Sequence, residues 1–204
     1  GKGFKMRQRL STYNNIPELM NLFRQIADIQ TQEMLNLPIP ELETGKPIVV
    51  SVKPSSAQRA FVDILSELSK EVSEGGFPDG SYNNLTVTND GRLGALDMRC
   101  TNEEKFENLG YNIDISDYEY SKVNSCVDET YQTYKNTKEK KLTQLIFCDL
   151  STPKEDGKFS VYTDIKEKLV KKGVNESEIA FIHDAKTDAQ KEEIFTKFRA
   201  GEIR

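Results

Sequence analysis

The stretch IAFIHDAKTDAQKEEIFTKFRAGEIR, residues 179–204, points most directly to the fold that we expect for this chain. It begins with a short apolar run typical of a buried strand, continues through a polar turn and ends in a helical pattern. Thr187 occupies the position of a helix N-cap, because a hydroxyl there can accept a hydrogen bond from the first turn. The apolar residues of this helix recur on one face: Ile194, Phe195 and Phe198.

A similar unit lies upstream. The apolar stretch LTQLIFCDL, residues 142–150, is followed by a polar loop and by a helical pattern carrying Val161, Ile165 and Leu169. Strand, helix, strand and helix in succession predict a parallel α/β sheet. Residues 202–204 look like the start of a further strand, so we expect the chain to end inside a domain. An unpaired edge at that point would favour self-association.

The first half of the chain predicts two further helices and one strand. Apolar residues recur at helical spacing from Ile16 to Ile29, with Pro17 in the first turn. The sequence PIVVSVKP, residues 47–54, is β-branched and bounded by prolines, as in a strand. The next helix should be capped by Ser55 or Ser56 and should end at the glycine pair 75–76.

The middle of the chain is less regular. We expect a loop at residues 77–84, a short helix at 90–99 and irregular structure at 101–119. A long helix should follow, with valines and tyrosines on one face and a lysine-rich end: Val123, Val127, Tyr131, Tyr134, Lys138, Lys140 and Lys141. These patterns divide the chain into an N-terminal helical segment (1–45), a strand with helices (46–119) and an α/β part (120–204).

Composition excludes several classes of protein. The 204 residues carry a net charge of -5, with 30% charged and 36% hydrophobic residues, as in an acidic globular protein. No apolar run reaches the length of a membrane span, and no signal-peptide pattern opens the chain. Cys100, Cys126 and Cys148 are widely spaced, which indicates free thiols in a reducing compartment such as the cytoplasm. The acidity argues against a freestanding nucleic-acid binder but leaves a local basic patch open.

No complete catalytic or metal motif is present. The Gly-Lys pair at Gly45 lacks the glycine and hydroxyl spacing of a phosphate-binding loop. His183 is the only histidine, so a multi-histidine metal site is excluded, and we expect it at a strand end. The acidic residues Asp114, Asp117 and Glu119 lack the spacing of a calcium loop and indicate a solvated loop.

Two polar turns are candidate phosphate contacts. In an open parallel sheet, ligands gather at the carboxyl ends of strands and at helix N-termini. Lys186, Thr187 and Lys191 follow one predicted strand, and Ser151 and Thr152 follow the other. Either turn could hold a phosphate of a nucleotide or of a nucleic-acid backbone. The alternative is that each is an ordinary helix start.

The order of these segments resembles the Swi/Snf-like branch of the superfamily-two helicases, which are ATP-driven translocases on duplex DNA. The resemblance covers most of residues 30–204. Five stretches carry it in order: LPIPELETGKPIVVSVKPSSAQRAFVDIL, LGALDMRC, SKVNSCVDETYQTY, LTQLIFCDLS and IAFIHDAKTDAQKEEIFTKFRAGEIR. They are similar to the exit from the first motor lobe, the interlobe helices and the start of a second RecA-like lobe. The last stretch is most similar to large bacterial proteins of phages and conjugative elements that join a helicase to an adenine-specific DNA methyltransferase.

The resemblance implies a fold and a function. It implies a partial RecA-like parallel sheet with flanking helices, preceded by a mostly helical interlobe region. The parent protein would be a hydrolase that uses ATP and Mg²⁺, and its partners would be duplex DNA and its own remaining lobes. The phosphate loop, the magnesium site and the arginine finger of such motors have no counterpart here, so we expect this chain alone to bind neither cofactor and to hydrolyse no ATP.

The resemblance also implies DNA-backbone contacts. These are Ser151, Thr152, Lys186, Thr187 and Lys191, with Arg92 and Arg99 as interlobe contacts, although Arg99 could equally be an ion-paired structural residue. Two positions depart from the family, which usually has glycine where Ala185 stands and arginine where Lys191 stands. A lysine keeps the charge but loses the bidentate fork. The alternative function is a non-catalytic protein-interaction module built on a degenerate lobe.

Overall fold

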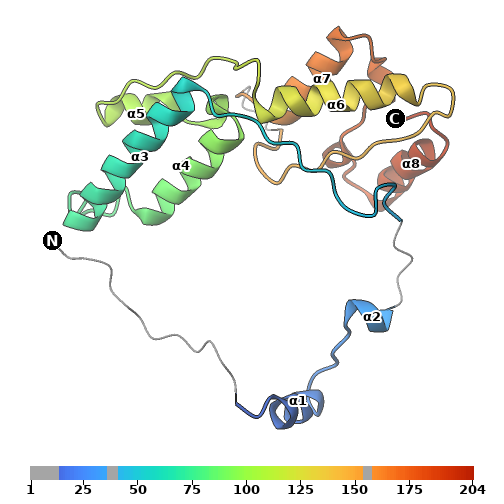
Figure 1. Cartoon of the computed structure of the whole chain (residues 1–204), viewed down its shortest axis with the longest axis horizontal. Helices are drawn as coiled ribbons and strands as arrows, with labels where there is room; N and C mark the ends of the chain where they lie inside the picture. Colours follow the sequence, from blue (N-terminus) through green and yellow to red (C-terminus); the bar gives the residue numbers. More distant parts are fainter. Residues whose placement is uncertain (1–13, 36–40, 154–157) are drawn as a thin grey trace. The chain divides into compact units, whose positions relative to one another are not determined.

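The computed structural model describes residues 14–35, 41–153 and 158–204 (Figure 1). These residues form helices joined by loops and turns, and no β-strand occurs among them. The α-helices are α1 (Ile16–Arg24), α2 (Gln32–Leu35), α3 (Ser56–Glu74), α4 (Asn84–Leu96), α5 (Glu103–Asn108), α6 (Lys122–Asn136), α7 (Val161–Lys171) and α8 (Asp188–Arg199). The short 3-10 helices are η1 (Met98–Cys100), η2 (Glu176–Glu178) and η3 (Ile182–Asp184).

The chain divides into two units, Gly1–Val49 and Val50–Arg204. In the first unit, α1 has a proline in its first turn, as predicted, but it ends at Arg24 rather than near Ile29. None of its residues is buried, and Ile26 just beyond it is 87% exposed. The apolar face of this helix therefore contributes no core to the described part of its unit.

The predicted parallel α/β fold is wrong for the residues that the structure describes. Segments 47–54, 142–150 and 179–182 lie within those residues and have strand-like sequences, yet none of them belongs to a β-ladder. Ile179 and Phe181 have extended backbone angles, but η3 begins at the next residue, Ile182. β-branched and aromatic residues favour an extended backbone, but a strand exists only when neighbouring main chains hydrogen-bond to it.

The segment at 202–204, predicted to be a free edge, is engaged instead. The Arg204 backbone N–H donates to the Glu178 carbonyl at 2.9 Å, and the Arg204 side chain donates to the Tyr134 carbonyl at 3.1 Å. The Arg204 guanidinium also lies 4.4 Å from the centre of the Tyr134 ring. Residue Arg204 is therefore held against α6 and against Glu178.

Helices α3 and α4 begin and end where local chemistry dictates. Ser55 and Gln58 form a capping box at the start of α3, and Gly75 ends it with a φ of 89°, a conformation that glycine adopts without strain. The side chain of Asn83 accepts hydrogen bonds from two backbone N–H groups of the first turn of α4. This cap starts α4 earlier than the predicted 90–99 helix. Asn102 likewise caps α5 inside the region that we expected to be irregular.

A first hydrophobic core joins α3, α4, η1 and α5. The Phe61 and Phe106 rings meet edge to face with their centres 4.9 Å apart, an arrangement that aromatic pairs favour. The buried members of this core are Phe61, Leu65, Leu68, Tyr82, Met98, Phe106 and Ile113.

Gly94 lets α4 approach this core closely. A Cβ atom at Gly94 would lie 2.6 Å from Cε1 of Phe61, whereas one at Gly91 would lie 3.5 Å from Leu65, an ordinary contact. We expect Gly94→Ala to destabilise the protein by about 1–3 kcal/mol through overpacking. Gly91→Ala, the matched control in the same helix, should stabilise it by up to about 1 kcal/mol through helix propensity. Urea unfolding of both variants checks this, and equal stabilities would contradict it.

A second core lies between α6 and α7, as the apolar spacing of both helices predicted. Its buried members are Val123, Val127, Val161, Ile165, Leu169 and Val174. The lysines 138, 140 and 141 lie beyond the end of α6 rather than in its last turn. Helix α8, by contrast, buries no residue completely, and Phe195 is 43% exposed.

Candidate functional site

Tyr162 on α7 contacts the residues that precede the two predicted phosphate turns. Its hydroxyl donates to the Cys148 carbonyl at 2.5 Å, and its ring meets Phe181 and His183 edge to face at 5.7 and 5.2 Å. Burial, followed by the nearby Cys148 and Asp149, raises the pKa of the Tyr162 phenol, which therefore keeps its proton at neutral pH. The carboxyl ends of segments 142–148 and 179–182 thus lie beside one side chain. No sequence pattern indicated this role for Tyr162.

The first turn contains Ser151 and Thr152. Ser151 has a left-handed backbone, with a φ of 55°, and its hydroxyl accepts from the Val161 N–H at 3.1 Å. Its carbonyl accepts from the Ser160 hydroxyl at 3.0 Å. Ser151 therefore holds the start of α7, and its hydroxyl also hydrogen-bonds to the Cys100 thiol. Thr152 is half-buried next to it.

Arg92 reaches the same turn from α4. Its guanidinium lies 3.3 Å from the Asp149 carboxylate, and the two side chains are 55% and 84% exposed. An exposed pair of this kind holds its partners weakly. Arg92 can therefore leave Asp149 for another anion at little cost.

The second turn contains Lys186 and Thr187 at the start of α8. Thr187 is the N-cap, as predicted, and it forms a capping box with Gln190. The Gln190 side chain also accepts from the Lys186 and Thr187 backbone N–H groups, at 2.9 and 3.1 Å. The capping box leaves the backbone N–H groups of residues 188 and 189 without a partner in the described part of the chain. The start of α8 can therefore offer these two N–H groups as hydrogen-bond donors to an anion.

The two lysines of this turn differ in their surroundings. The Lys186 ammonium forms no ion pair with any residue that the structure describes, and the residue is exposed. Lys191 lies 3.2 Å from the fully exposed Asp188 carboxylate. Such an i,i+3 pair at the surface is weak, so both lysines are accessible to a phosphate.

Arg99 is held by three carboxylates. Its guanidinium lies 2.7 Å from Asp97, 3.0 Å from Asp164 and 3.1 Å from Asp117. It also stacks 4.3 Å from the centre of the Phe159 ring. Only 14% of the side chain is exposed. This geometry favours the structural alternative for Arg99 over a DNA contact.

Asp117 is part of this network rather than of a solvated loop. Lys168 joins it by lying 2.7 Å from Asp117 and 2.8 Å from Asp164. Burial works to raise the pKa of Asp117, but the hydrogen bond from Lys168 and the charge of Arg99 lower it more, so the pKa lies below its ordinary value. The network ties the segment before α6 to α7 and to η1.

The three cysteines are free and half-buried. Burial raises the pKa of the Cys100 thiol to about 11 and also raises that of Cys126. Both thiols therefore stay protonated at neutral pH, where a thiol is a poor nucleophile. This excludes Cys100 and Cys126 as activated nucleophiles in the structure as it stands.

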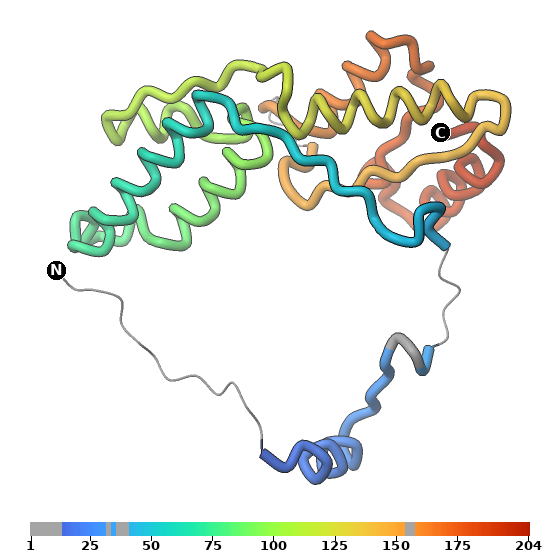
Figure 2. Tube along the Cα trace, in the orientation of Figure 1, coloured from blue at the N-terminus to red at the C-terminus, as the bar shows by residue number. Residues whose placement is uncertain are grey.

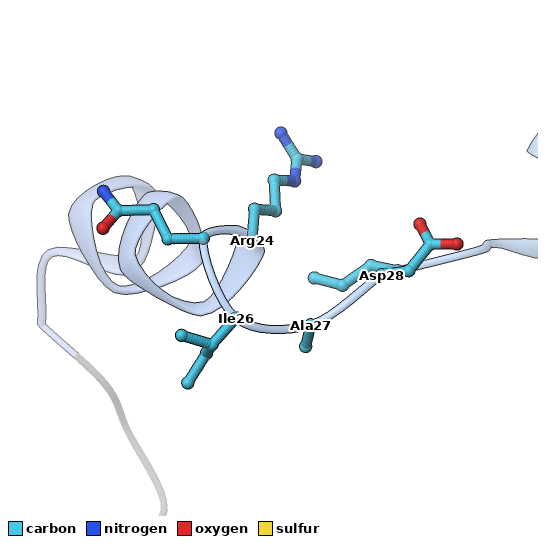
Figure 3. Close-up of a pocket in the computed structure, with 6 residues that line it drawn as sticks. Arg24, Ile26, Ala27 and Asp28 are labelled. Carbon is cyan, nitrogen blue, oxygen red and sulfur yellow. The ribbon is translucent and has the colours of Figure 1, made fainter.

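A shallow pocket follows α1 but does not form a site. Residues 24–29 line it, and Figure 3 shows the side chains of Arg24, Ile26 and Asp28 spreading away from one another along the turn. Polar groups that bind a ligand converge on one point. The lining residues therefore do not form a convergent ligand site.

The described part of the chain also contains no group of three or more histidine, cysteine, aspartate or glutamate side chains able to hold a metal ion. No helix in that part is long and apolar enough to cross a membrane. Comparisons of the chain with protein-family models, with curated proteins and with solved structures found no match.

Proposed function

We propose that this chain is a DNA-contacting segment of an ATP-dependent DNA translocase of the Swi/Snf-like helicase class. The observation that carries the proposal is that Tyr162 contacts both Cys148 and His183, which shortly precede the two polar turns. Phosphate groups of a DNA strand would contact Lys186, Thr187 and Lys191 in one turn. At the other turn, the phosphate groups would contact Ser151 and Thr152. Arg92 on α4 would lie beside these two residues.

The geometry suits a backbone contact rather than base reading. Ammonium groups, hydroxyls and helix N–H groups are the usual partners of phosphate oxygens and carry no sequence information. ATP and Mg²⁺ would be bound by other parts of a larger polypeptide, and duplex DNA and those parts would be the partners. Free, half-buried thiols suit a cytoplasmic protein.

A titration with short duplex DNA at several salt concentrations tests the proposal. The double variant Lys186→Ala, Lys191→Ala should bind more weakly than the wild type. The slope of log K against log salt should become shallower by about 1.8, because each lost phosphate contact removes about 0.9. The charge-matched control is Lys171→Ala, Lys172→Ala, which removes two positive charges at the far end of α7. This control should keep the wild-type slope.

Two outcomes would contradict the proposal. One is the absence of DNA binding by the wild type even at the lowest salt. The other is an equal loss in both double variants, which would show that net charge alone is responsible.

A protein-interaction module is the second candidate function. It is favoured by the exposed apolar side chains Leu145 and Phe147 together with the net charge of -5. Binding dominated by apolar contacts would change little with salt, unlike binding to phosphates. A partner that binds equally well at low and high salt would therefore support this candidate over DNA.

A further inference from the structure

The segment of residues 142–149 is drawn out like a β-strand, but no neighbouring strand pairs with it among the described residues. We name residues 142–149 the apolar edge. Figure 2 shows residues 142–148 as a drawn-out run beside α6, and the Gln144 side chain donates to the Thr130 carbonyl of that helix at 3.1 Å. Cys148 packs against the second core. Between these two inward side chains, Leu145 is 65% exposed and Phe147 is 89% exposed. Gln144 and Cys148 thus face inward, whereas Leu145 and Phe147 face outward, and Ile146 between them is 40% exposed.

Among the described residues, the main chain of the apolar edge forms no backbone–backbone hydrogen bond, although the Cys148 carbonyl accepts from the Tyr162 hydroxyl. The backbone N–H groups of residues 142–149 donate to no other backbone group in the part of the chain that the structure describes. An extended apolar segment with free N–H and C=O groups is a template for another strand. The alternative template at residues 202–204 is engaged, because the Arg204 N–H bonds to Glu178.

We propose that the apolar edge pairs with the same edge of a second copy of this chain, antiparallel about a twofold axis. The axis would pass through Leu145, so that Leu145 lies opposite its counterpart and Thr143 lies opposite Phe147. The same register places Lys141 opposite Asp149, twice per dimer. Isologous contacts of this kind are the usual way in which identical chains associate.

Charge complementarity selects a second copy as the occupant. The apolar edge contains no charge between Leu142 and Cys148, but a lysine precedes it and an aspartate ends it. An antiparallel partner satisfies both ends when its own chain also runs from a lysine to an aspartate, as a second copy does. The present partner of Asp149 is the exposed Arg92, which holds it weakly. Opposite charges across a strand pair stabilise it and like charges destabilise it.

Light scattering over a range of concentrations tests the proposal, with folding of each variant checked by circular dichroism. The wild type should shift from monomer to dimer as concentration rises. Leu145→Lys should stay monomeric, because it would place two ammonium groups on the axis. Val62→Lys is the matched control, since Val62 on α3 is also a large exposed apolar residue, 59% exposed. It should dimerise like the wild type.

Charge reversal tests the register. Lys141→Glu alone and Asp149→Lys alone should each raise the dimer dissociation constant about tenfold, because each places like charges opposite one another twice. An equimolar mixture of the two variants should recover dimers, because the introduced carboxylate of one chain would face the introduced ammonium of the other. A wild type that stays monomeric, a Leu145→Lys variant that dimerises, or a mixture that stays monomeric would each overturn the proposal. The inference stands independently of the proposed function.

Discussion

Replacing Arg99 by alanine should lower the free energy of unfolding by about 3 kcal/mol or more, because it leaves buried carboxylates without their counter-charge. Asp97 and Asp164 are 3% and 13% exposed, and both lie within 3.0 Å of the guanidinium. Lys168 still faces Asp164 and Asp117 in the variant, but no other cation in the described part of the chain lies against Asp97. Asp97 therefore bears most of the penalty.

The same network predicts how the stability difference between the wild type and Arg99→Ala changes with pH. The pKa of Asp117 lies below its ordinary value of 3.8, so its contribution to stability is fully present at neutral pH. That contribution is lost as the pH falls through the lowered pKa. Because the charge of Arg99 is one cause of the lowering, the difference in stability between wild type and Arg99→Ala should narrow in acid.

Urea unfolding at neutral and acidic pH checks both expectations. Arg92→Ala is the control, because its ion pair is exposed and its loss should change stability by no more than about 0.5 kcal/mol. Arg99→Lys should recover only part of the loss, since an ammonium cannot reproduce the planar fork that meets two carboxylates. An Arg99→Ala protein as stable as Arg92→Ala would show that the network contributes nothing.

Replacing Phe106 by alanine should lower the free energy of unfolding by about 3–5 kcal/mol, because it removes a ring from the centre of the first core. Phe106 is 0% exposed, and its ring supports that of Phe61. Thermal and urea unfolding should both report the loss. The cavity left behind can be partly filled by leucine, so Phe106→Leu should cost less than half as much.

Phe195→Ala provides the matched control for this large effect. Phe195 lies on α8 and is 43% exposed, so its truncation should cost about 1 kcal/mol or less. Similar losses at Phe106 and Phe195 would contradict the assignment of Phe106 to the centre of the core.

The sequence predicted the features of the site that depend on neighbouring residues. It placed Thr187 at the start of α8 and so identified where Lys186 and Lys191 would lie on that helix. It did not predict the partners of Arg99 or the role of Tyr162. Asp164 is 65 residues from Arg99, and Tyr162 is 14 residues from Cys148. No periodic pattern reports a pairing over such separations.

Local sequence was enough to set both ends of α3, the start of α8 and the buried stripe of α7, because caps and apolar spacing act within one or two turns. Ser55, Gly75 and the stripe of Val161, Ile165 and Leu169 illustrate this. Whether the strand-like segments became a sheet depended instead on contacts between distant parts of the chain. Segments 142–150 and 179–182 have the composition of strands, but a strand is completed by the main chain beside it. Which main chain lies beside a given segment depends on the tertiary fold, and local sequence does not encode it.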